Sequence, residues 1–146
     1  MTAPAARTGP ERPRTAPTRG LPRLLIADDD NVIQTALYMQ LSRDFEIVGS
    51  ARNADEAIEL AERHQPDVAI LDVQMPGGGG LRATREIHAR VPGIAIVALS
   101  SDESDSVVMA MLEAGAVTYV RKGRPGHELA SLLRTSIAAH VKLTAV

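Results

Sequence analysis

The feature that most constrains the fold is a series of five short apolar runs that recur along the chain. Each run is four to six residues long, and the runs occupy residues 24–27, 47–51, 68–71, 94–99 and 117–120. Several of them are apolar at every position, as strands buried between two layers of helices must be. The pattern therefore predicts five central strands of a parallel sheet.

The segments between the runs have helical spacing. Asn53 followed by Glu56 resembles a capping box that opens a helix, and Pro66 marks the far limit of that helix. Further apolar stripes predict helices over 81–88, 107–112 and 129–137. Strands that alternate with helices predict an α/β fold, a doubly wound five-stranded parallel sheet with five helices. Right-handed crossovers allow few strand orders, and the flavodoxin-like order 2-1-3-4-5 is a common one.

Composition sets the limits of the domain and excludes several classes of site. Residues 1–22 contain five prolines among Ala, Thr and Arg, so we expect a disordered tail followed by one ordered domain over 23–142. The arginines of the tail leave a net charge of about −5 on the remainder, which offers nucleic acid little attraction. The absence of cysteine excludes disulfides and thiolate metal sites. With no secretory signal or membrane-spanning stretch visible, we expect a cytoplasmic protein.

Polar side chains follow four of the predicted strands, and in a parallel sheet this edge is where ligands bind. Three acids follow the first strand, one acid the third, a hydroxyl the fourth and an amine the fifth. Helix capping and turn formation account for one or two such residues but poorly for the whole set. The residues are Asp28, Asp29, Asp30, Asp72, Ser100 and Lys122.

The predicted strand order places the first and third strands side by side, so Asp28, Asp29 and Asp72 should converge. Three carboxylates so close repel one another, and either protonation or a bound cation must relieve the repulsion. Oxygen ligands with few protein contacts suit Mg²⁺, which keeps waters and reaches out to a phosphate. Lys122 and Ser100 lie on the opposite flank, where they could contact a phosphoryl group carried by Asp72. Asp30 is expected to be a helix cap or a solvated acid.

These residues resemble the receiver domain of bacterial two-component response regulators, closest in kind to the nitrate-response type. The likeness covers residues 23 to about 140 and rests on four motifs in order. They are LLIADDD at 24–30, VAILDVQMPGGGG at 68–80, ALSS at 98–101 and YVRK at 119–122. Each motif alone is weak, whereas four in order with fitting spacing are specific.

The resemblance implies a role for each site residue. Asp72 would accept a phosphoryl group from the phosphohistidine of a sensor histidine kinase or phosphotransfer protein. Asp29 and Asp72 would bind Mg²⁺ directly, Asp28 would bind it through water, and the backbone carbonyl of Gln74 would complete the protein ligands. Lys122 would pair with a phosphoryl oxygen. The protein would then be a phosphoacceptor that assists its own phosphotransfer and autodephosphorylation, not an enzyme in the ordinary sense.

The resemblance also implies a switch. Ser100 would move inward to hydrogen-bond the phosphoryl group, and Tyr119 would change rotamer as it moves, which would alter the face made by the last two helices and the fifth strand. That face would bind a downstream protein or a second copy of the chain. Gln74 and Asp102 occupy positions that tune the lifetime of the phosphoaspartate in the family.

Two departures from the family pattern bear on the site. Gly123 follows the lysine where many receivers have proline, which leaves the geometry of that loop open. The run Gly77-Gly78-Gly79-Gly80 lacks the usual side chains between its glycines, which could loosen the loop beside Asp72. A receiver-like binding module that acts without phosphorylation is therefore an alternative.

Other functions fit the sequence less well. Asp28-x-Asp30-Asn31-Val32 matches the first motif of haloacid dehalogenase-like phosphatases, but that family needs an acidic pair after its lysine, and Glu128 is the only acid after Lys122. The chain has little length after His140, so we expect either a stand-alone receiver or the receiver fragment of a longer DNA-binding transcriptional regulator. By itself this chain is expected to bind neither nucleic acid nor membrane.

Overall fold

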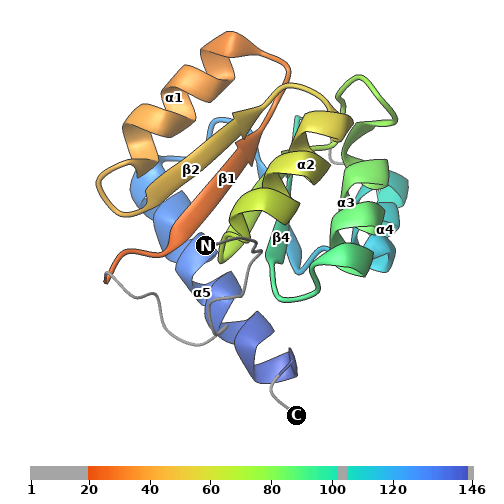
Figure 1. Cartoon of the computed structure of the whole chain (residues 1–146). Coiled ribbons are helices and arrows are strands. Elements are labelled where there is room, and N and C mark those ends of the chain that lie inside the picture. The colour runs from red at the N-terminus through yellow and green to blue at the C-terminus, as the bar shows by residue number, and fades with distance from the viewer. Residues whose placement is uncertain (1–19, 102–104, 145–146) are drawn as a thin grey trace, which may run out of the picture.

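A computed structural model describes residues 20–101 and 105–144. Strands and helices alternate from one end of this part to the other (Figure 1). The strands are β1 (Arg23–Ala27), β2 (Glu46–Ala51), β3 (Val68–Asp72), β4 (Ala95–Ser100) and β5 (Thr118–Arg121). The helices are α1 (Asn31–Leu41), α2 (Ala54–His64), α3 (Gly79–Arg90), α4 (Asp105–Ala114) and α5 (Gly126–Thr144). Most of the expected tail, residues 1–19, lies outside the described residues, and so does Asp102.

The sheet confirms the predicted fold. All strand pairs are parallel, and the strand order is β2-β1-β3-β4-β5. Each strand begins and ends within one residue of the apolar run that predicted it. The agreement is close because the central strands are buried on both faces: every residue of β3 and β4 is buried.

The core has two parts, one on each side of the sheet. Alternate residues of β1 face opposite sides, so Leu24 and Ile26 belong to one part while Leu25 and Ala27 belong to the other. The first part is completed by α1 and α5, and the second by α2, α3 and α4 (Figure 1). Phe45 is the one aromatic side chain among the buried described residues, so packing is almost wholly aliphatic.

The capping box predicted for α2 is present with a small difference. Asn53 Oδ1 accepts a hydrogen bond from the Glu56 amide at 2.8 Å, and Glu56 Oε1 in turn accepts from the Arg52 amide at 2.9 Å. The reciprocal bond thus reaches the residue before the cap. The helix ends at His64, after which Gln65 adopts a left-handed conformation with φ of 46°. Pro66 follows, as predicted.

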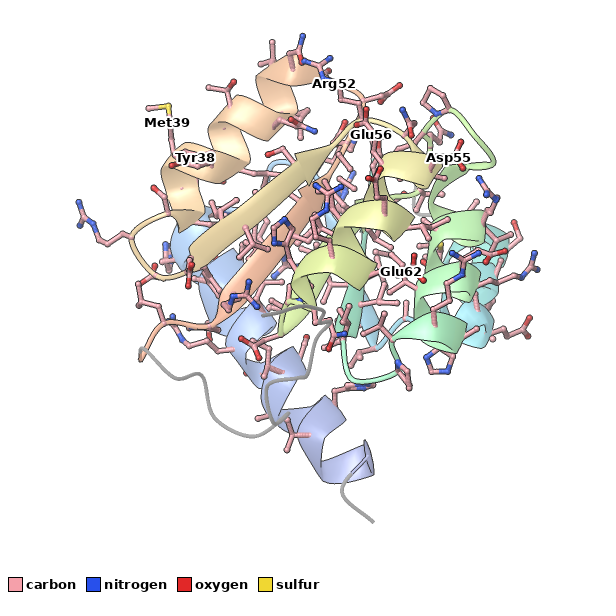
Figure 2. The ribbon with its side chains drawn as sticks, in the orientation of Figure 1. Tyr38, Met39, Arg52, Asp55, Glu56 and Glu62 are labelled. Carbon is pink, nitrogen blue, oxygen red and sulfur yellow. The ribbon has the colours of Figure 1, made fainter. Side chains whose placement is uncertain are left out.

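Helix α1 is not marked by an apolar stripe in the sequence, because it is uncharged and carries apolar side chains on its outer face as well. Val32 and Met39 are 75% and 74% exposed, and Tyr38 and Met39 project outward in Figure 2. Asp30 caps this helix, since its Oδ1 accepts from the Val32 amide at 2.8 Å. None of the helices in the described part of the chain has the length and hydropathy needed to cross a lipid bilayer.

Candidate functional site

An acidic cluster forms where β1 and β3 end. Ala27 pairs with Leu71 in the sheet, so the residues that follow them, Asp28 and Asp72, meet at one edge. One ligand oxygen from each of Asp28, Asp29 and Asp72 lies within 4.8 Å of the others. Asp28 and Asp72 are buried, whereas Asp29 is exposed. The cluster therefore combines two desolvated carboxylates with one that faces solvent.

Asp28 is held through its amide and one carboxylate oxygen, whereas its other carboxylate oxygen lacks a hydrogen bond within the described residues. Its amide donates to the Ala51 carbonyl at 2.9 Å, and its Oδ1 accepts from the Asp30 amide at 2.9 Å. Its Oδ2 is buried and lacks a well-oriented hydrogen bond within the described residues, although Lys122 Nζ lies 3.1 Å away. The ion pair supplies charge, but the capacity of this oxygen to accept a hydrogen bond or bind a ligand is not filled within the described residues.

Lys122 joins the two buried carboxylates. Its amide donates to the Ser100 carbonyl at 3.0 Å, which holds the segment after β5 against the end of β4. Its Nζ lies 3.1 Å from Asp28 Oδ2 and 3.3 Å from Asp72 Oδ2. Burial by itself would lower the pKa of Lys122, but the close contact with Asp28 Oδ2 and the charges of both carboxylates outweigh it and raise the pKa. The side chain is therefore a permanent cation at neutral pH.

The carboxyl of Asp72 is less acidic than an ordinary aspartate. Burial and the nearby charge of Asp28 raise its pKa from 3.8 to about 6, against the hydrogen bond from the Gln74 amide and the charge of Lys122, which lower it. The Gln74 amide lies 3.2 Å from Asp72 Oδ1. A bound cation would oppose the repulsion within the cluster and keep this carboxylate ionised.

The other predicted residues lie around this cluster. Ser100 is buried at the end of β4 and pairs with Arg121 of β5. Tyr119 is 38% exposed and pairs with Ala98, so it lies on β5 near the same edge. Gln74 contributes its backbone to the site while its side chain is exposed.

Two residues that support the acidic cluster were not predicted from the sequence. Gln34 Nε2 donates to the Asp28 carbonyl at 2.7 Å and so ties α1 to the segment that carries the acids. Arg82 of α3 holds the loop after Asp72 through the Gly77 carbonyl, at 2.8 Å. Both are polar helix residues whose side chains reach back to a distant loop carbonyl, and nothing in their local pattern distinguishes them from solvated residues.

The geometry of this site indicates which chemistry it could support. A buried carboxylate that is anionic at neutral pH can act as a nucleophile, and a fixed ammonium 3.3 Å away can neutralise charge that develops on an attached group. Three carboxylates that share one space suit a hard divalent cation of the Mg²⁺ type.

The family model and the individual relatives that match this chain agree with one another. The family model described as the response regulator receiver domain matches residues 24–134. The chain is 35% identical over 118 residues to the response regulator GacA from Pseudomonas viridiflava, covering 80% of this chain and 55% of GacA. It is 36% identical over 116 residues to the oxygen regulatory protein NreC from Staphylococcus epidermidis, covering 77% and 53%. The chain thus spans about half the length of these curated relatives.

A solved structure has the same fold. The crystal structure of a DNA-binding response regulator of the LuxR family from Staphylococcus aureus superposes with a TM-score of 0.76 at 28% sequence identity. The superposition covers 80% of this chain and 99% of that one. The likeness extends over nearly all of the described sheet and helices.

Proposed function

This chain belongs to the family of response regulator receiver domains, and on that premise we propose that Asp72 is the residue that takes up the phosphoryl group. Receiver domains are the phosphoacceptors of two-component signalling and partner with histidine kinases. The observation that supports Asp72 most directly is the contact of its Oδ2 with Lys122 Nζ at 3.3 Å, inside a cluster of three carboxylates. Asp28 contacts Lys122 in the same way, at 3.1 Å, so what distinguishes Asp72 is its place in the motif VAILDVQMPGGGG, which resembles the segment around the phosphorylated aspartate of the family.

The residues at the site fit Mg²⁺. The donors are all oxygens, and Asp28 Oδ2 is buried without a well-oriented hydrogen bond in the described part of the chain. Asp29 and Asp72 would hold the ion directly, Asp28 through water, with the carbonyl of Gln74 as the fourth protein contact. When bound, Mg²⁺ neutralises the carboxylates and draws a phosphoryl oxygen toward them.

In the proposed reaction an oxygen of Asp72 forms a bond to phosphorus as the bond from phosphorus to the donor's histidine nitrogen breaks. The electron pair of the broken bond stays on the imidazole, which then takes a proton from solvent. Lys122 faces the transferred group and stabilises its negative oxygens. Ser100, at the end of the neighbouring strand, donates its hydroxyl to another of these oxygens. Gln74 and Asp102, by their positions in the sequence, are proposed to tune the lifetime of the phosphoaspartate, as the matching residues do in the family.

A direct experiment tests the acceptor. The protein is incubated with acetyl phosphate and Mg²⁺, and its intact mass is measured. We expect a single species heavier by one phosphoryl group, and we expect Asp72→Asn to abolish it while Asp30→Asn, which changes only the α1 cap, retains it. A wild-type protein that gains no mass would favour the phosphorylation-independent binding module.

The output of the domain is proposed to be a change at the face made by α4, β5 and α5. Tyr119 belongs to β5, and an open groove of about 610 Å³ lies between the start of β5 and α5, lined by residues that include Val117, His127 and Leu132. Phosphorylation adds about −1.5 to −2 charges at the adjacent edge, which is enough to shift a two-state side-chain arrangement. The groove would then accept a downstream protein or a second copy of the chain.

Two measurements examine this output. Chemical-shift changes on phosphorylation should extend from the acidic cluster to Tyr119 and to the groove, and shifts confined to the cluster would contradict the proposal. Sedimentation of the phosphorylated and unmodified protein would then show whether a second copy is the occupant.

The extent of the domain and its place in a longer protein are also proposals. We propose that the receiver domain spans 23–142, since the described core lies between Leu24 and Leu133. Relatives such as GacA are nearly twice the length matched here. Regulation of transcription through a further domain is therefore a function proposed for a longer protein, with this chain as its receiver. Phosphotransfer from a panel of purified histidine kinases would identify the partner.

A further inference from the structure

The loop between β3 and α3 is unusually free of side chains close to the proposed phosphorylation site. Gly77, Gly78 and Gly79 all have positive φ values, of 85°, 102° and 74°. Glycine loses more backbone freedom on ordering than any other residue, so a run of glycines is costly to hold in one conformation. In addition, α3 has Gly78 at its N-cap position and no side-chain capping bond. Other contacts must therefore hold this loop.

Those contacts come from α2 and from α3 itself. The base of the loop is closed by the Gly80 amide, which donates to the Val73 carbonyl at 2.9 Å. Farther out, the Pro76 carbonyl accepts from the Ala54 amide at 3.0 Å, which rests the loop on the start of α2. The Gly77 carbonyl accepts from Arg82 Nη1 at 2.8 Å.

Arg82 links this loop to a second helix. The same Nη1 lies 2.9 Å from Asp55 Oδ1, in the first turn of α2. Figure 2 labels Asp55 at the start of α2, beside the loop that leads into α3. The aliphatic part of Arg82 also covers Gly78, because a Cβ added at Gly78 would lie 2.8 Å from Arg82 Cδ. One side chain thus packs on the loop, bonds its backbone and ties it to α2.

The loop in turn supports the acceptor. The Gln74 amide, near the start of the loop, donates to Asp72 Oδ1, and the Gln74 carbonyl is the proposed fourth ligand of Mg²⁺. If the loop moves, both the hydrogen bond and the carbonyl move with it. The conformation of residues 74–79 therefore sets how well the site is organised before any ligand binds.

We propose that Arg82 is a positioning residue for the metal and phosphorylation site, and that with Asp55 it forms a clamp that replaces the side chains missing from the glycine loop. The inference rests on the proposed function, because it concerns the same Mg²⁺ site. Loss of the clamp lowers Mg²⁺ affinity and slows phosphorylation of Asp72 through disorder in the loop, although Arg82 contacts neither ligand.

Two readouts on Arg82→Ala test the clamp. Amide hydrogen exchange without metal should accelerate at Ala54, Gln74 and Gly80, whose amides are bonded through or within the loop. The Mg²⁺ dissociation constant, measured by titration calorimetry, should rise about two- to tenfold, since the contact is partly exposed yet supports a ligand. Arg82→Lys should recover part of both effects, because an ammonium can replace the single Nη1 that makes both contacts but sits on a side chain that is one bond shorter.

Matched variants separate the clamp from a general loss of stability. Arg85→Ala removes an exposed arginine from the same helix and should change neither readout. Asp55→Asn keeps a hydrogen-bond acceptor for Arg82 but removes the charge, and should give an intermediate effect.

Each outcome decides one of the two proposals. Unchanged exchange or unchanged Mg²⁺ affinity in Arg82→Ala would reject the clamp, because both must change together. A wild-type protein that binds no Mg²⁺ would contradict the proposed function. The exchange rates, which need no metal, would still decide whether Arg82 holds the loop.

Discussion

The carboxylates of Asp28 and Asp72 and the ammonium of Lys122 lie together in a largely buried site, so a change of charge on one of them changes the electrostatic environment of the other two. Asp28 and Asp72 are almost fully buried, and Lys122 Nζ lies within 3.3 Å of an oxygen of each. One ammonium cannot neutralise two carboxylates, so the ligand-free site carries an excess of negative charge. Burial, together with this excess charge, raises the pKa of Asp72, and the excess charge also explains the fit to a cation.

The first prediction concerns Asp72→Asn in the absence of Mg²⁺. The folded pKa of Asp72, about 6, lies above the ordinary 3.8, so the stability that this group contributes is present below about pH 4 and lost as the pH rises through 6. At pH 7 the wild type therefore bears a cost that asparagine removes. We expect the variant to gain up to about 3 kcal/mol in free energy of unfolding at pH 7, and almost nothing at pH 3.5. Urea unfolding at both pH values measures this, and equal gains would contradict it.

The second prediction concerns Lys122→Met. Removing the ammonium leaves two buried carboxylates unpaired, so we expect a loss of about 2–4 kcal/mol in free energy of unfolding at pH 7 without metal. The loss should shrink as the pH falls through 6, because protonation of Asp72 then relieves the repulsion. Arg124→Met, which removes an exposed cation two residues away, is the control and should change stability little. A loss independent of pH would indicate that packing alone is responsible.

The residues of the site were predictable from sequence to different degrees. Asp28, Asp29, Asp72 and Lys122 each follow an apolar strand, and the ends of parallel strands meet at one edge whatever the details of packing. Gln34 and Arg82 could not be found this way, because their roles depend on which distant carbonyl a long side chain reaches. The pKa of Asp72 was equally hidden, since it depends on burial and on distances between strands.

At the level of helices and strands, a single glycine brings α3 close to the site. Gly80 lies in the first turn of α3, and a Cβ there would overlap the carbonyl oxygen of Asp72 and lie 2.9 Å from Val73 Cα. The helix can therefore start directly against the end of β3. This close approach keeps the loop after Asp72 short and its base closed.

The third prediction compares Gly80→Ala with Gly123→Ala. The first should cost about 1–3 kcal/mol in free energy of unfolding, because backbone atoms of β3 must move. The second should cost about 1–2 kcal/mol by strain alone, since Gly123 has φ of 91° and open space around it. Only Gly80→Ala should also weaken Mg²⁺ binding through displacement of Asp72. Denaturant unfolding and metal titration of both variants measure the difference, and equal metal affinities would contradict the expectation.

The strands and helices of this fold could be predicted from the sequence to different degrees. The bounds of the strands were predicted to within one residue, because a short continuous apolar run bounded by polar residues is typical of a strand buried on both faces. Helix α1 was expected only from the alternation of elements, since its exposed Val32 and Met39 erase the stripe that marks an amphipathic helix. The conformation of residues 77–79 could not be predicted, because glycine accepts almost any backbone angle.

For the whole molecule, the described core is contained in the part that matches the family. The buried hydrophobic residues run from Leu24 to Leu133, and the family match runs from residue 24 to 134. The acidic cluster lies at the edge of the sheet between the two parts of the core.

The fourth prediction follows from the position of the described core within residues 24–133. A chain that begins at residue 20 should keep its free energy of unfolding to within about 0.5 kcal/mol, and should be labelled by acetyl phosphate at an unchanged rate. Thermal or urea unfolding and the labelling time course of the two chains test this. A truncated chain that unfolds more easily, or that labels more slowly, would show that residues 1–19 contribute to the domain.

The chain has no tryptophan and only two tyrosines, Tyr38 on the outer face of α1 and Tyr119 on β5. Replacing Tyr38 by phenylalanine would leave Tyr119 as the sole source of tyrosine fluorescence. The protein would then carry its own optical reporter at the strand where the switch is proposed, without any attached dye. Stopped-flow mixing with a phosphodonor could follow that strand in real time, and its signal could be compared with the rate at which the mass increases.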